Sequence, residues 1–186
     1  LIIFLSNHCK VSQKFQKPLI SINKKWMDNG IKLFVISPNI EKAILPDELA
    51  YSEVGDSMDG MKERARLQNY NFPYLYDGDN QTITSALNAK ITPTAFLFNS
   101  KGEMKYVGKV GNHKSPNSIE EYELNQSIND LINGNTKFVR TKTYGTAIKF
   151  PKDLKLAEDV QNRYSREKVL LNYANERKLN FYLRQN

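Results

Sequence analysis

The chain contains a single cysteine, Cys9, and the sequence around it points to chemistry. It follows the apolar run LIIFL at residues 1–5 and a short polar turn, and the residues after it have helical spacing. A cysteine in the first turn of a helix lies near free backbone N–H groups and the positive end of the helix dipole. Both favour the thiolate, the form that attacks disulfides and peroxides. We therefore predict a reactive thiol at Cys9.

The polar residues next to Cys9 predict that this part of the chain lies at the surface. The alternative is that Cys9 is a small buried apolar residue, which is a common state of free cysteine. Ser12 lies one helical turn after Cys9, so its hydroxyl is placed to hydrogen-bond the thiolate; the alternative is an ordinary serine on the helix surface. His8 is adjacent to Cys9, but neighbouring side chains at a helix start diverge, so we interpret His8 as a surface residue.

A second candidate is the Thr92-Pro93-Thr94 triplet, which comes just before an apolar strand-like run. A proline in this place is either an ordinary strand-entry residue or part of a specified turn with a cis peptide bond. The sequence pattern alone leaves both open. The second histidine, His113, lies in the glycine-containing stretch VGNHKSPN after the predicted hairpin and is expected in a surface loop. One cysteine and two histidines do not supply a usual zinc ligand set, so no metal is predicted.

The elements that must position these residues follow from hydrophobic periodicity. Residues 1–5 and 31–36 are predicted as buried strands, and residues 10–28 as an amphipathic helix between them, which makes a right-handed parallel unit. Further predicted elements are helices over 57–69, 80–88 and 117–133, a strand at 73–76, and an antiparallel hairpin of strands at 94–98 and 103–108. This order predicts an α/β fold in which a mixed sheet has helices on both faces.

The domain organisation is predicted from the same pattern. Residues 1–134 form one α/β domain, 135–151 an extended linker, and 152–186 a helical extension, with a charged helix over 152–178. Residues 37–56 have weak periodicity, and long connections of this kind often serve as flaps or interaction surfaces. Because the chain begins inside a strand-like run and stops abruptly, we interpret it as a piece of a longer protein whose extension leads into a further domain.

Charge and apolar content argue against two classes of partner. The chain has 186 residues and a formal net charge of +7, but its basic residues are interleaved with acidic ones. This pattern is typical of a solvated basic surface, so a nucleic-acid partner is not predicted. No apolar run reaches the ~18 residues that a membrane-spanning helix needs.

These features resemble the thioredoxin superfamily, and within it the redoxin branch of alkyl hydroperoxide reductase and thiol-specific antioxidant domains. The segment LIIFLSNHCKVSQKF resembles that branch's strand, cysteine and helix, and ITPTAFLFNSKGE resembles its later strand segment. The resemblance covers residues 1–133. It implies a thioredoxin-like fold in which a cis-proline, Pro93, faces the reactive cysteine. It further implies a groove for a thiol or peptide substrate formed by Thr92, Pro93 and Ser6, and no metal or organic cofactor.

Two departures from this family pattern concern the sulfur atoms. Thioredoxin enzymes use Cys-x-x-Cys, whereas here Ser12 replaces the second cysteine. The tail TYGTAIKF resembles a subfamily segment, GCSIKW, and Thr146 stands where that segment has its cysteine. A dithiol cycle within this chain is therefore excluded, and what remains is monothiol chemistry at Cys9.

The function predicted on this basis is that of a monothiol thiol–disulfide oxidoreductase, in which Cys9 and Ser12 form the catalytic pair. An outside thiol, either a small molecule or a second thioredoxin-like domain, would release the mixed disulfide. One alternative is a degenerate domain that uses the same groove to bind peptides or to scaffold a catalytic neighbour. Another is a thiol peroxidase, which is less well supported because Ile2 stands where peroxidatic loops have proline, although Ser6 matches their threonine position. The resemblance suggests an extracytoplasmic location.

Overall fold

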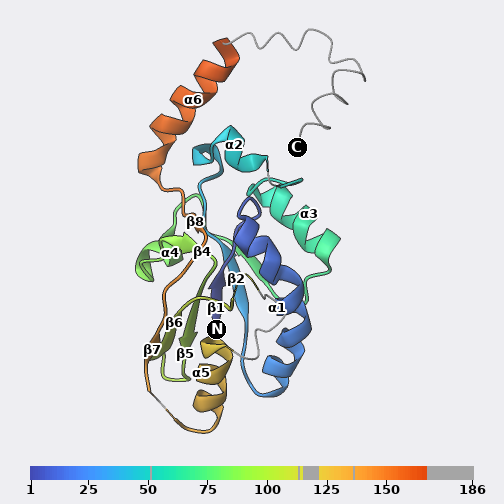
Figure 1. The fold of residues 1–186 in the computed structure, drawn as a ribbon, viewed down its shortest axis with the longest axis vertical. Helices are drawn as coiled ribbons and strands as arrows, with labels where there is room; N and C mark the ends of the chain where they lie inside the picture. Colours follow the sequence, from blue (N-terminus) through green and yellow to red (C-terminus); the bar gives the residue numbers. More distant parts are fainter. Residues whose placement is uncertain (51, 113, 115–121, 136, 167–186) are drawn as a thin grey trace.

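The computed structural model describes residues 1–50, 52–112, 114, 122–135 and 137–166 (Figure 1). Its strands are β1 (Ile2–Phe4), β2 (Phe34–Ser37), β3 (Tyr74–Tyr76), β4 (Ile91–Thr92), β5 (Thr94–Phe98), β6 (Met104–Gly108), β7 (Val139–Arg140) and β8 (Thr146–Ala147). Its α-helices are α1 (Lys10–Asp28), α2 (Pro46–Leu49), α3 (Met58–Gln68), α4 (Thr82–Ala86), α5 (Glu123–Ile132) and α6 (Leu154–Arg166). Short 3-10 helices η1 (Glu41–Ala43) and η3 (Pro151–Asp153) complete the described elements.

Six strands form a mixed sheet in the order β3-β2-β1-β5-β6-β7. β1 and β2 pair in parallel, as do β2 and β3, so the strand–helix–strand unit predicted around α1 is confirmed. β5 runs antiparallel to both β1 and β6, which confirms the predicted hairpin. The α/β class with a mixed sheet and a C-terminal helix is therefore confirmed.

The side chains of β1 alternate between the two faces of the sheet, as they do in any strand. Ile3 packs into a core with α1 and α5, whereas Phe4 faces a second core on the other side. The first core includes Phe15 of α1 and Leu124 of α5, and burying each such side chain contributes about 1.5–3 kcal/mol. The two cores cover both faces of β1, which lies between β2 and β5 in the sheet (Figure 1). The loop that follows β1 therefore starts from a strand that is packed on both sides.

Several predicted bounds shifted by a few residues. β2 begins at Phe34 rather than at residue 31, because the turn that closes α1 continues to Ile31, whose N–H bonds the Trp26 carbonyl. α3 begins one residue after Ser57, whose hydroxyl accepts the Gly60 N–H as a helix N-cap. The weakly periodic segment at residues 37–56 contains two short helices, η1 and α2. The described part of the helix predicted over 117–133 is α5.

The segment interpreted as a linker, residues 135–151, is extended but pairs with the domain in the structure. β7 joins the main sheet beside β6, and β8 forms a separate two-stranded sheet with β4. Ile148 is buried in the second core. α6 follows and packs against η1, and the rest of the helix predicted over 152–178 lies outside the described residues. Within the described part of the chain, no helix has the length and apolar content needed to cross a bilayer.

One buried hydrogen bond joins α1 to α5, and its removal tests this packing. The Trp26 Nε1–H donates to Asn125 Oδ1 at 2.9 Å, and both residues are buried. Asn125→Ala leaves the indole N–H without this acceptor, so we expect the free energy of unfolding to fall by about 1–3 kcal/mol in urea titrations. Asn129→Ala is the control, because it lies exposed on the same helix and has the same gain in helix propensity. Equal effects of the two substitutions would contradict the prediction.

Candidate functional site

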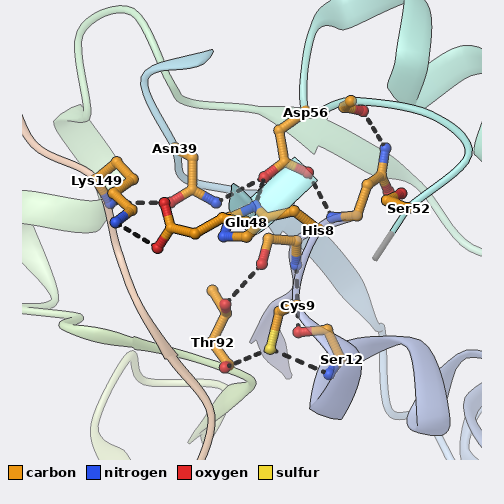
Figure 2. A network of polar contacts seen from close by, with 12 residues as sticks. His8, Cys9, Ser12, Asn39, Glu48, Ser52, Asp56, Thr92 and Lys149 are labelled. Atoms are coloured by element: carbon orange, nitrogen blue, oxygen red, sulfur yellow. Dashed lines mark hydrogen bonds and ion pairs between the residues drawn. The ribbon is translucent and has the colours of Figure 1, made fainter. Parts of the chain in front are cut away.

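Cys9 is the N-cap residue of α1, at the point where the loop after β1 becomes a helix. Its Sγ accepts the Ser12 backbone N–H at 3.4 Å, in the way that a serine hydroxyl caps a helix. On its other side the thiol donates to the Thr92 carbonyl oxygen at 3.2 Å (Figure 2). The sulfur is therefore held between the first turn of α1 and the loop that carries Thr92.

The Thr92–Pro93 peptide bond is cis, as the resemblance implied, and lies between β4 and β5. Ser6 reaches the same loop, because its hydroxyl and that of Thr92 are 2.7 Å apart. The structure thus brings together the predicted residues Cys9, Ser6, Thr92 and Pro93, which come from segments more than eighty residues apart.

Ser12 is also in this group, but its hydroxyl has a different partner from the one predicted. The backbone N–H of Ser12 serves the sulfur, whereas its side-chain oxygen accepts the Ser6 N–H at 3.3 Å. Ser12 is fully buried, so it is not a helix-surface serine either. Its hydroxyl connects the turn before Cys9 to the first turn of α1.

The prediction that this turn lies at the surface is wrong. Cys9 and Asn7 are 0% exposed, Ser6 is 1% exposed and His8 is 3% exposed. The interpretation of His8 as a surface residue is therefore also wrong. The physical reason is that the polar groups of the turn find hydrogen-bond partners inside the protein, so they do not need water.

Asp56 is the main partner of this turn. The sequence alone did not identify it as a site residue. It is fully buried in the loop before α3. Its Oδ1 accepts the Asn7 N–H at 2.5 Å, and its Oδ2 contacts His8 Nδ1 at 2.5 Å and accepts from Asn39 Nδ2 at 2.9 Å. The only sequence signal was its place at the end of the long segment 37–56, just before the helix predicted over 57–69.

A further shell of contacts connects Asp56 to the C-terminal segment. Asn39 Oδ1 accepts the Lys149 backbone N–H at 2.9 Å, and the Lys149 ammonium pairs with Glu48 of α2 at 2.6 Å. Gln81 donates to the Lys149 carbonyl at 2.7 Å. Lys149 is thus held through its backbone and its side chain (Figure 2), and it fixes the chain just after β8.

Asn7 is held by three further contacts. Its Nδ2 donates to the Gly55 carbonyl at 2.7 Å, its carbonyl accepts from Gln13 at 2.6 Å, and its Oδ1 accepts the Tyr74 hydroxyl at 3.1 Å. Burial, and secondly the nearby Asp56, raises the pKa of Tyr74 well above its ordinary value, so the phenol is a neutral donor. The turn before Cys9 therefore has little freedom to move.

Two buried polar atoms of this region, His8 Nε2 and Ser37 Oγ, have no hydrogen-bond partner within the described residues. Nδ1 of the same His8 ring contacts Asp56. The other histidine, His113, lies outside the described residues. Across the part of the chain that the structure describes, no three His, Cys, Asp or Glu side chains form a group that could hold a metal.

β8 covers the Thr92 side of the site. It pairs antiparallel with β4, with Thr146 opposite Thr92. Gly145 has φ +153° and packs directly on the loop: a Cβ there would lie 1.9 Å from the Thr92 carbonyl oxygen and 3.0 Å from Pro93 Cδ. Only glycine fits such an approach. The oxygen that accepts the Cys9 thiol is therefore covered by this chain's own C-terminal segment.

Comparisons with known proteins bear on the fold alone. No family model matches the chain, and no curated protein does. The structure of a hypothetical protein, SMc02350 from Sinorhizobium meliloti 1021, is similar with a TM-score of 0.67 and 20% identity, over 80% of this chain and 78% of that one. An uncharacterized conserved protein from Geobacillus kaustophilus is similar with a TM-score of 0.62 and 24% identity, over 80% and 75% of the two chains. The α/β fold is thus shared with proteins described as hypothetical or uncharacterized.

The role of Asp56 can be tested by its removal. Asp56→Ala leaves three buried donors without their acceptor, and each such donor costs about 1–3 kcal/mol. We expect the free energy of unfolding to fall by about 3 kcal/mol or more in urea titrations. Asp59→Ala is the control, because its exposed carboxylate pairs with Lys62 at the surface and contributes at most about 1 kcal/mol. A loss below about 1 kcal/mol for Asp56→Ala would show that the turn does not depend on this carboxylate.

Proposed function

We propose that this chain carries out monothiol thiol–disulfide exchange through Cys9. The observation that carries the proposal is the position of the sulfur, between the Ser12 N–H and the Thr92 carbonyl. The N-terminus of a 19-residue helix favours negative charge on an atom placed there, and a thiolate is the attacking species. The segment of Thr92 and Pro93 lies against the sulfur through the Thr92 carbonyl, which is the side of the site that the family resemblance implied.

The chemistry divides into two exchange steps. The Cys9 thiolate attacks one sulfur of a substrate disulfide, the S–S bond breaks, and the second substrate sulfur leaves as a thiol after taking up a proton. Because Cys9 is the only cysteine, no thiol of this chain resolves the mixed disulfide. An outside thiol attacks it, takes the substrate sulfur into a new disulfide and restores Cys9. A second thioredoxin-like domain of the same protein is the partner we propose for this step.

A second candidate function is favoured by one observation, the complete burial of the sulfur. A degenerate domain that binds or scaffolds a partner needs no accessible thiol. The peroxidase alternative is less well supported, because Ile2 stands where peroxidatic loops have proline and the Ser6 hydroxyl is already bonded to Thr92. Exchange requires Cys9 to become accessible, whereas scaffolding does not. The two functions can therefore be distinguished by displacing β8, which packs on Thr92.

Displacing β8 is expected to expose the sulfur. Gly145→Ala places a methyl group against the Thr92 carbonyl and pushes β8 away from β4. We expect alkylation of Cys9 by iodoacetamide, followed by intact-mass spectrometry, to be at least tenfold faster than in the wild type. Gly134→Ala is the matched control, because Gly134 has a positive φ but nothing within 4 Å of the added carbon. A rate unchanged by Gly145→Ala would show that β8 does not control access.

Once access is provided, the exchange reaction itself can be measured. We expect Gly145→Ala protein to form a glutathione adduct at Cys9 from oxidised glutathione, and dithiothreitol to reverse it. A peptide of residues 4–15 is the control, because it has the same cysteine and neighbours without the fold. The helix terminus should make the protein react at least fivefold faster than the peptide. A protein rate equal to or below the peptide rate would favour the scaffold function, and Cys9→Ser should abolish the adduct.

A further inference from the structure

The face of the sheet that carries the second core becomes more exposed toward its last strands. Across this face, Phe96 of β5 is opposite Val107 of β6, and Val107 is opposite Arg140 of β7. Phe96 is buried, Val107 is half-buried and Arg140 is exposed. On the other face β6 is covered, because α5 packs against it and Tyr106 is fully buried. The second core therefore ends at β6, next to the β7 edge of the sheet (Figure 1).

A pocket of about 280 Å³ lies where the second core ends, between the connection from α4 to β4 and the segment that follows β7. Its apolar lining residues are Leu87, Ala89, Ile91, Phe96, Met104 and Val107. Within the described residues, no acidic side chain lines it. Its volume is just below the roughly 300–1,000 Å³ that is typical of ligand pockets, so the pocket suits a small ligand.

Two threonine hydroxyls of the pocket lining are already bonded within the protein. Thr141 Oγ1 is 2.7 Å from the Tyr106 hydroxyl and accepts the Lys109 N–H at 3.0 Å, which fixes the segment after β7. The Thr94 hydroxyl donates to the Ile91 carbonyl at 2.6 Å. A ligand that depends on many hydrogen bonds, such as a sugar, therefore gains little from these hydroxyls. An apolar chain fits the lining better, because its burial removes apolar surface from water.

The exposed residues that line the pocket give it a positive charge. They are Asn88, Lys90 and Arg140, and neither of the two cations has a carboxylate partner among the described residues. Arg140 Cζ lies 6.0 Å from the centroid of the Phe138 ring, and Lys90 Nζ lies 4.9 Å from that of the Phe150 ring. An aromatic ring attracts a cation without neutralising its charge. The solvent side of the pocket is therefore complementary to an anion, and a guanidinium matches the geometry of a carboxylate.

We propose that this pocket binds a small amphipathic carboxylate, with its apolar chain against β5 and β6 and its carboxylate at Arg140. Burial of the chain supplies the attraction, and the ion pair with the guanidinium orients the ligand. Lys90 adds a second positive charge at the solvent side. The volume limits the chain to a medium length, so the ligand is a free carboxylic acid rather than a membrane lipid. This proposal does not depend on the thiol chemistry.

The binding is tested by NMR titration of the full chain, labelled with carbon-13 at its methyl groups. The probes are octanoate, which has chain and charge, 1-octanol, which has the chain alone, and acetate, which has the charge alone. We expect octanoate to give saturable shifts at the methyl groups of Met104 and Val107. Its affinity should be about threefold or more above that of 1-octanol and about tenfold or more above that of acetate. Equal affinities for octanoate and 1-octanol, or no saturable shift with octanoate, would overturn the proposal.

Arg140→Gln removes the guanidinium at an exposed position, so the fold is expected to stay intact. We expect this variant to bind octanoate about threefold or more weakly and to bind 1-octanol as the wild type does. Lys142→Gln is the matched control. Lys142 is exposed in the same segment and lies 5.5 Å from the centroid of the Tyr144 ring, but it does not line the pocket. Equal effects of the two substitutions on octanoate would overturn the assignment of the carboxylate to Arg140.

Val107→Phe tests the place of the apolar chain. The larger side chain fills the pocket from a half-buried position, so we expect octanoate and 1-octanol both to lose their effect on the Met104 methyl group while the urea midpoint is kept. Unchanged binding of octanoate to this variant would overturn the proposal. A shift of the Met104 methyl group with protein concentration alone would show that a second copy of the chain occupies the pocket, and would overturn it as well.

Discussion

The buried carboxylate of Asp56 is the interaction on which the site depends. A charged group fully removed from water is tolerated only where it is compensated by donors, and here a backbone N–H, an imidazole and an amide supply them. These donors come from the turn before α1 and from the loop after β2, so the carboxylate joins the two loops that follow the paired parallel strands β1 and β2. The turn is thereby held inside the protein, and the position of the Cys9 sulfur follows from it.

The elements of the fold were predictable because their signals are local. LIIFL is short and wholly apolar, and the apolar residues of α1 recur with helical spacing, so a parallel unit followed from composition and period alone. The association of Cys9 with Thr92 and the cis-Pro93 came from the family resemblance, since no local signal joins residues eighty-three positions apart. The ends of an element differed from the prediction where a turn or a helix cap sets them, as at the start of β2.

What the sequence could not show was which polar residues are satisfied inside. A run of Ser, Asn and His is usually solvated, and it was interpreted that way. The partner that reverses this interpretation, Asp56, is 49 residues from Asn7, and Lys149 is 110 residues from Asn39. Such pairs leave no trace in a single sequence, because each member alone is an ordinary polar residue. Burial of polar side chains is therefore the property of this site that only three-dimensional structure supplies.

The connection between β8 and α6 is short, so a movement of α6 is transmitted to β8. After Ile148, Lys149 is fixed by Asn39, Gln81 and Glu48, and only Phe150 and η3 separate it from the first turn of α6. There is no spacer in which a rotation of α6 could be absorbed. Tension or torque applied to that helix therefore acts on the Lys149 anchor and the β4–β8 ladder before it reaches the six-stranded sheet. The residue just before β8, Gly145, packs on the Thr92 oxygen that accepts the Cys9 thiol, so such a force also acts next to the sulfur.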